Sequence, residues 1–127
     1  MSVADTVRSY YDSLRSGEPL HPYFVQSPTT VKIGVFSTRV GFEAVKNGLQ
    51  EQTATTTDWS VSSTALQTVE RQDTGRFWDA VTLRWTDSET GRRHSFDTRW
   101  TGQLARETAT TDWKFTLMHV SAPSPNG

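Results

Sequence analysis

The sequence predicts an α+β domain in which N-terminal helices pack in a curved, mostly antiparallel β-sheet, forming a cone-shaped barrel that is open at one end. Two observations lead to this fold class. Helical periodicity is confined to residues 2–16 and about 41–52, whereas the chain after residue 58 has almost unbroken strand character. Helices followed by a long run of strands favour a layer of helices on one face of a single sheet.

The first helix has a recognisable start and end. Ser2 followed three residues later by Asp5 resembles a capping box, and Gly17 is a natural stop. Apolar residues recur at helical spacing between them, at Val3, Val7, Tyr10, Tyr11 and Leu14. The second helix carries Phe42, Val45 and Leu49 on one face.

The segments around these helices are short or irregular. Residues 18–28 contain three prolines, which favours an irregular path with a short helical turn near residues 21–24. Short strands are expected at 31–33 and 38–40. Longer strands are expected at roughly 58–71, 76–87, 92–106 and 112–121, separated by turn residues. We expect one domain over residues 1–122 and a disordered tail over residues 123–127.

Composition excludes several classes of function. The 127 residues hold 13 Lys plus Arg against 14 Asp plus Glu, so no basic surface favours nucleic acid. The chain has no cysteine, which excludes disulfides, thiol nucleophiles and cysteine-ligated metals. No signal peptide and no membrane-spanning apolar run of about 20 residues is apparent. We therefore expect a cytoplasmic protein that binds no membrane.

The tripeptide Arg-Trp-Thr occurs twice, at residues 84–86 and 99–101, on either side of a segment that has the composition of a turn. The two copies are expected to form the arms of one β-hairpin. With an even-membered loop and no bulge, paired residue numbers sum to an odd value. Arg84 and Arg99 would then share one sheet face, and Trp85 and Trp100 would share the other.

Three segments carry a resemblance to a known family. They are Tyr10-Tyr11 in the first helix, the strand-to-helix junction Val40-Gly41-Phe42-Glu43-Ala44-Val45, and the ending over residues 113–123. Together they resemble a SnoaL-like domain of the nuclear transport factor 2-like superfamily, which has the cystatin-like cone fold. The ending is similar to the association domain of calcium/calmodulin-dependent kinase II, although Leu117 replaces the first histidine of that pattern and only His119 and Ser121 remain.

This resemblance implies a binding cavity in the cone. Association domains of this kind have arginines on consecutive strands that line a cavity for small carboxylates, and Arg84 and Arg99 match two of them by position. Two guanidinium groups suit a planar anion. We therefore expect both arginines to face the cone. Tyr10 and Tyr11 are expected either at the cavity mouth or in the core. Lys32 and Arg39 would flank the cavity only if their short strands lie at its rim, which the sequence leaves open.

The opposite sheet face is expected to carry a homodimer interface. A sheet covered by helices on one side leaves its other side bare, so Trp85 and Trp100 are expected to pack against a partner subunit, or else to stack on an aromatic ligand.

Asp97 and His119 are the candidate catalytic residues. Either could move a proton while arginine and tyrosine stabilise negative charge. The alternative for Asp97 is a cross-strand salt bridge with Arg84, and for His119 a half-buried backbone contact or a subunit interface. His21 and His94 are expected on the surface. Three scattered histidines make no metal site, and no cofactor motif is present.

Three functions follow from these observations. The first is a small-molecule pocket protein that binds a polar or carboxylate ligand. The second is a lyase or isomerase that uses Asp97 or His119 as acid or base. The third is an oligomerisation module without catalytic activity.

Overall fold

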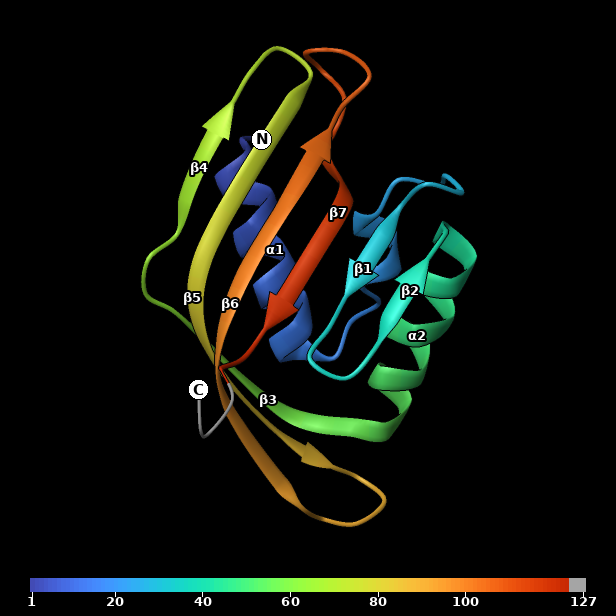
Figure 1. Ribbon diagram of the computed structural model, residues 1–127, viewed down its shortest axis with the longest axis vertical. Helices are drawn as coiled ribbons and strands as arrows, with labels where there is room; N and C mark the ends of the chain where they lie inside the picture. Colours follow the sequence, from blue (N-terminus) through green and yellow to red (C-terminus); the bar gives the residue numbers. More distant parts are fainter. Residues whose placement is uncertain (124–127) are drawn as a thin grey trace.

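The computed structural model describes residues 1–123 and contains two α-helices, a short 3-10 helix and seven strands (Figure 1). The helical elements are α1 (Val3–Ser16), η1 (His21–Tyr23) and α2 (Phe42–Thr55). The strands are β1 (Val31–Ile33), β2 (Thr38–Val40), β3 (Thr56–Ser63), β4 (Gln67–Glu70), β5 (Thr74–Asp87), β6 (Arg93–Ala105) and β7 (Lys114–Ser121). Except for Pro123, the tail expected at residues 123–127 lies outside the described residues. Over residues 1–123, no helix is long and apolar enough to cross a membrane.

The seven strands form one curved and unclosed sheet in the order β2-β1-β7-β6-β5-β3, with β4 also paired to β5. All neighbours are antiparallel except β1 and β7, which run parallel. Helix α1 lies across the concave face of the sheet, and α2 lies beside β1 and β2 (Figure 1). The α+β cone expected from the sequence is therefore confirmed.

The expected ends of the first helix are also present. The Ser2 hydroxyl accepts the Asp5 N–H at 3.0 Å, and the Asp5 carboxylate accepts the Ser2 N–H at 2.9 Å. Gly17 ends the helix in the left-handed conformation at φ 70°. The strand expected over residues 58–71 is divided into β3 and β4, because the chain leaves the sheet between them.

The β5–β6 hairpin has the predicted parity. Thirteen residue pairs follow each other without a bulge, from Thr74 with Ala105 to Thr86 with Arg93. Arg84 and Arg99 therefore share one sheet face, and Trp85 and Trp100 share the other.

The side assigned to each pair was wrong. The two tryptophans face the concave, helix-covered side and are only 8% and 3% exposed, whereas both arginines are exposed on the outer face. Covering an indole ring removes a large apolar area from water, whereas burying a guanidinium without a partner is unfavourable. Trp85 and Trp100 are thus enclosed by their own chain and cannot form the expected subunit interface.

Aromatic rings from α1 fill the concave face. Tyr10 makes edge-to-face contacts with Tyr23, Trp100 and Phe115 at centroid distances of 5.3, 6.0 and 5.5 Å. Tyr11 meets Trp100 edge-on at 5.3 Å. Such contacts stabilise aromatic pairs by about 0.5–1.5 kcal/mol beyond the burial of their area. Both tyrosines are therefore core residues of the helix–sheet interface.

A buried carboxylate connects three parts of this core. Asp79 on β5 is fully buried and faces α1. Its Oδ2 accepts hydrogen bonds from the Tyr11 hydroxyl at 2.8 Å and the Ser63 hydroxyl at 2.5 Å. Its Oδ1 accepts the Ala65 N–H at 3.0 Å. One side chain thereby holds α1, the end of β3 and the β3–β4 connection on the sheet.

Replacement of Asp79 is expected to destabilise the whole domain. Asp79→Ala leaves the buried Tyr11 hydroxyl and the half-buried Ala65 N–H without partners, at a cost of about 2–4 kcal/mol in the free energy of unfolding. Asp79→Asn is the matched control, since its amide oxygen can still accept from Ala65 while its NH2 donates to the two hydroxyls. Chemical denaturation measures both variants. Equal losses for Ala and Asn, or no loss for Ala, would contradict this role.

Candidate ligand-binding site

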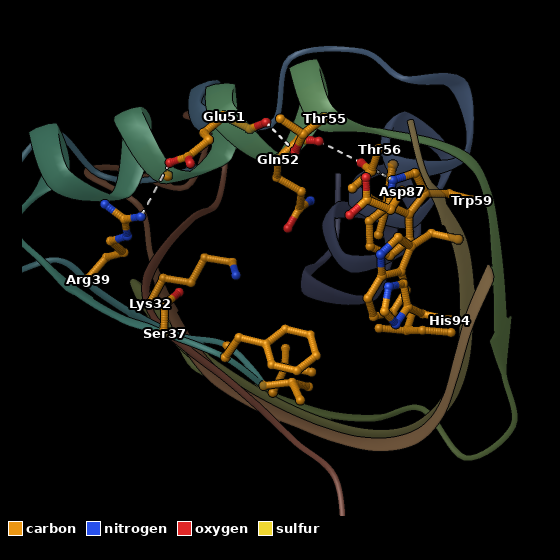
Figure 2. A pocket seen from close by; sticks show the side chains of 18 of the residues that line it. Lys32, Ser37, Arg39, Glu51, Gln52, Thr55, Thr56, Trp59, Asp87 and His94 are labelled. Carbon is orange, nitrogen blue, oxygen red and sulfur yellow. Dashed lines mark hydrogen bonds and ion pairs between the residues drawn. The ribbon is translucent and has the colours of Figure 1, made fainter. Parts of the chain in front are cut away.

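A cavity of about 370 Å³ opens at the end of the cone, between α2, the β1–β2 hairpin and the ends of β5 and β6. Its walls are chemically different. One wall is aromatic and comes from β3, β5 and β6, and the other is polar and comes from β1, β2 and α2 (Figure 2). The residues that line this cavity include Tyr10, Lys32, Phe36, Arg39, Glu51, Gln52, Trp59, Trp85, Asp87 and His94.

The aromatic wall is a stack of flat rings. Trp59 lies parallel to Trp85 at a centroid distance of 4.7 Å, and His94 stacks on the same indole at 5.1 Å. Phe96 also lies nearly parallel to Trp85, at 5.5 Å. Phe36, from the β1–β2 turn, meets Phe96 edge-on at 5.6 Å and is 72% exposed. The stack therefore forms one aromatic wall of the cavity, with one exposed ring close to it.

A β-bulge turns Trp59 toward this stack. The pairing of β3 with β5 shifts between Thr57 and Ser60, and Asp58 within the shift has a positive φ of 56°. Arg93 Nη1 donates to the Asp58 carbonyl at 2.7 Å, and Trp59 Nε1 donates to Thr56 Oγ1 at 2.8 Å. Bulges re-aim side chains in this way. Here the bulge is accompanied by contacts that hold it and the indole in place.

The polar wall is built around a cross-strand pair of cations. Lys32 on β1 lies directly opposite Arg39 on β2, and on its other side it pairs with Met118, which is fully buried on the concave face. Register therefore directs both cations inward. Arg39 forms an ion pair with Glu51 of α2 at 3.7 Å, while the Lys32 side chain extends toward the middle of the cavity (Figure 2).

The Lys32 amine is in an unusual electrostatic position. Burial, and then the neighbouring Arg39 charge, lower the pKa of this amine from 10.5 to about 8. Within residues 1–123 the Lys32 side chain has no hydrogen bond and no ion pair. The cavity thus holds a partly desolvated amine that is available to a ligand.

The four charged residues proposed from the sequence lie elsewhere. Arg84, Arg99, Asp97 and His119 are all exposed on the outer sheet face. Asp97 accepts a hydrogen bond from Thr82, which lies opposite it, at 3.0 Å. The expectation that both arginines face the cone is wrong, because the covered face takes the apolar residues of each strand.

The tyrosines and histidines are distributed differently from the expectation. Tyr10 is one of the residues that line the cavity, but burial raises the pKa of its phenol well above the ordinary value. Burial, and then the hydrogen bond to Asp79, raise the pKa of Tyr11. His94 stacks in the cavity wall and His21 is half-buried against Phe42, so neither is an exposed surface residue.

Sequence reasoning missed Trp59 and His94 as cavity residues and left Lys32 and Arg39 undecided. The alternation of side chains along β5 contained a signal for Trp59 and His94, because both stack on Trp85 of that strand. Phe77, Val81 and Leu83 share their parity with Trp85, and a strand face with that many large apolar groups is the covered one. The placement of Lys32 had no local signal, because it depends on the parallel pairing of β1 with the distant β7.

Over residues 1–123, no group of three or more His, Asp or Glu side chains is arranged to hold a metal ion.

A curved sheet wrapped around a helix, with a cavity at its open end, is the cystatin-like cone fold, which nuclear transport factor 2-like proteins also have. No protein-family profile matches the chain, and no curated protein matches its sequence. Solved structures do match. A nuclear transport factor 2-like superfamily protein from Salmonella enterica has a TM-score of 0.81 and 16% identity over 97% of this chain and 89% of its own.

Two further structures illustrate the range of proteins with this fold. A candidate calcium/calmodulin-dependent kinase II association domain from Xanthomonas campestris has a TM-score of 0.78 and 17% identity, over 97% of this chain and 86% of its own. A candidate dehydratase of the same superfamily from Streptomyces avermitilis has a TM-score of 0.81 and 14% identity, over 96% of this chain and 94% of its own. At such identities the likeness defines the fold alone, so function has to be argued from the cavity.

The burial of Lys32 is expected to lower the stability of the fold. The folded-state pKa of about 8 lies below the ordinary value of 10.5, so the folded state binds fewer protons between these values and its stability rises with pH there. Lys32→Met is therefore expected to raise the free energy of unfolding by about 1–2 kcal/mol at pH 7. The gain should narrow above pH 8 and vanish near pH 11.

Denaturation of wild type and Lys32→Met at several pH values tests this expectation, since other titrating groups cancel in the difference. Lys114→Met, at an exposed position of β7, serves as the control and should show no such pH-dependent gain. A gain for Lys32→Met that stays constant from pH 7 to pH 11 would contradict the effect of amine burial.

Proposed function

We propose that this chain is a small-molecule binding protein whose ligand has a flat aromatic body and an anionic group, held in the cavity at the open end of the cone. The observation that carries the proposal is the arrangement of Lys32 and Arg39 opposite the stacked rings of Trp59 and Trp85. Pockets for such ligands are mostly apolar and carry a few convergent polar groups.

Each wall supplies a different part of the recognition. The exposed side of the ring stack suits an offset parallel or edge-on aromatic ring. Lys32 supplies a positive charge that has no ion-pair partner within residues 1–123, and Arg39 adds a second one whose fork is only partly engaged by Glu51. A carboxylate is favoured because it accepts charge-assisted hydrogen bonds from both groups. The proposed ligand is still the carboxylate expected from the sequence, but Lys32 and Arg39 bind it in place of Arg84 and Arg99.

The alternative enzyme assigned to Asp97 and His119 is not supported by their positions. Both side chains lie on the outer face, on the far side of the sheet from the cavity. A ligand in the cone is therefore out of their hydrogen-bond reach. Among the fold neighbours, a candidate dehydratase is consistent with a small-molecule pocket but supplies no catalytic residue here.

Calorimetric titration with 2-naphthoate and its neutral analogue 2-naphthamide tests the proposal. We expect the carboxylate to bind about tenfold to a hundredfold more tightly than the amide, since a charge-assisted hydrogen bond contributes about 1.5–3 kcal/mol. Lys32→Met should remove most of this preference, and Trp59→Ala should weaken both probes. Arg84→Ala combined with Arg99→Ala is the control and should leave both affinities unchanged.

The same titration should depend on pH. Because the pKa of the free Lys32 amine is about 8, the affinity for 2-naphthoate is expected to fall as pH rises above that value, and Lys32→Arg should abolish the fall. Equal binding of the carboxylate and the amide, or loss of binding in the outer-face double variant, would overturn the proposed site.

We also propose a homodimer through the outer face of the sheet. One row of outward side chains crosses five strands, from Thr38 on β2 through Ile33, His119 and Thr101 to Trp78 on β5, which is 42% exposed. Val40 at the opposite edge is 63% exposed. A two-fold axis that runs parallel to β7, the middle strand of this set, and lies over its outer face would bring the Val40 edge of one copy over the Trp78 edge of the other.

Sedimentation velocity at micromolar concentration tests the dimer. The wild-type chain is expected to sediment as a dimer and Trp78→Lys as a monomer, because the substitution places a charge in the apolar contact. Arg92→Ala, in the β5–β6 loop, is the control and should remain dimeric. A monomeric wild type, or a dimeric Trp78→Lys variant, would contradict this interface.

A further inference from the structure

We infer that Lys32 is a reactive amine that forms a reversible imine with an aromatic aldehyde bound in the cavity. The inference rests on the proposed function, in which the aromatic ring of the ligand lies against the ring stack. It adds a covalent step to that binding. Two features of the site carry it. One is the position of the amine in the cavity. The other is its set of charged neighbours, which includes a cation but, within residues 1–123, no carboxylate paired with the amine.

The first feature is position. Lys32 extends from β1 into the space between Arg39 and the ring stack, so a ring that lies against Trp59 directs a substituent toward the amine (Figure 2). The backbone on both sides of Lys32 is held by β2 and β7. An amine on a rigid strand is presented more reproducibly than one on a surface loop.

The second feature is the set of charged groups around the amine. Arg39 faces it from β2, Glu51 from α2, and Asp87 and His94 from the far wall (Figure 2). Glu51 is paired with Arg39, and neither carboxylate forms an ion pair with Lys32 within residues 1–123. Nothing in that part of the chain therefore holds the amine in its charged form, while Arg39 and burial both disfavour it.

These surroundings raise the fraction of molecules in which the Lys32 amine is neutral and therefore nucleophilic. With a pKa of about 8, Lys32 is neutral in about a quarter of molecules at pH 7.5, whereas an amine with the ordinary lysine pKa of 10.5 is neutral in about one in a thousand. Lysines that are desolvated, or that lie beside another cation, are activated in this way for attack on carbonyl groups.

The chemistry needs no further reactant. The Nζ lone pair attacks the aldehyde carbon, a C–N bond forms, and the carbonyl oxygen takes one proton from nitrogen. The resulting carbinolamine then loses that oxygen as water, together with the second proton of nitrogen, and the C=N bond forms. Water returns the free aldehyde and amine by the reverse steps, so the adduct persists only when it is trapped.

Reductive trapping tests the inference, and the chain supplies its own controls. Its three lysines are Lys32, Lys46 and Lys114. Native protein is treated with 2-naphthaldehyde and cyanoborohydride at pH 7.5, and peptide mass spectrometry locates the secondary amine. We expect at least tenfold more labelling at Lys32 than at either other lysine, with saturation as the aldehyde concentration rises. Lys32→Arg should remove this labelling, and Trp59→Ala should reduce it.

The outcomes separate this inference from the proposed function. Equal labelling of the three lysines in a chain that binds 2-naphthoate would overturn the imine and leave the carboxylate site standing. Selective labelling of Lys32 without any binding of 2-naphthoate would support the imine and overturn the carboxylate ligand. Thermal melting of each variant confirms that the labelled protein is folded. Labelling of Lys32 that persists unchanged in Trp59→Ala would overturn the role of the ring stack.

Discussion

The unbroken pairing of β5 with β6 is the constraint on which the rest of the structure depends. Because side chains alternate across the sheet, a slip by one residue would exchange every inward group of a strand for an outward one. In the observed register Trp85, Trp100 and Asp79 share the concave face. One pairing thus supplies the apolar cover for α1, the carboxylate that anchors that helix, and the central ring of the cavity wall.

The anchoring carboxylate and the cavity lie at different places on the same strand. Asp79 holds α1 and the β3–β4 connection against the middle of β5, so rings and hydrogen bonds fill the interior there. Further along β5, at Trp85 and Asp87, α1 no longer covers the sheet and α2 with the β1–β2 hairpin forms the opposite wall. The cavity therefore exists because two separate helices cover one long, curved sheet.

Most of the fold could be predicted from local patterns, and the site could not. The capping box at Ser2, the helical stop at Gly17 and the parity of the two Arg-Trp-Thr copies depend on neighbours in sequence or on one hairpin. The apolar residues that alternate along β5 indicate which face of the sheet is covered. The family resemblance led to the opposite assignment, with the arginines facing the cone. The neighbourhood of Lys32 depends on a parallel contact between residues 31–33 and 117–119, which no periodicity encodes.

The electrostatics of Lys32 connect the two proposed uses of the cavity. A bound carboxylate favours the ammonium form and raises the pKa of the amine, whereas addition to an aldehyde requires the neutral form. The two ligand types therefore compete for different protonation states of one side chain. Arg39 biases this balance, since its charge attracts the anion and also lowers the pKa of the lysine. The cavity should thus prefer anions below pH 8 and become more reactive toward carbonyl groups as the pH rises through that value.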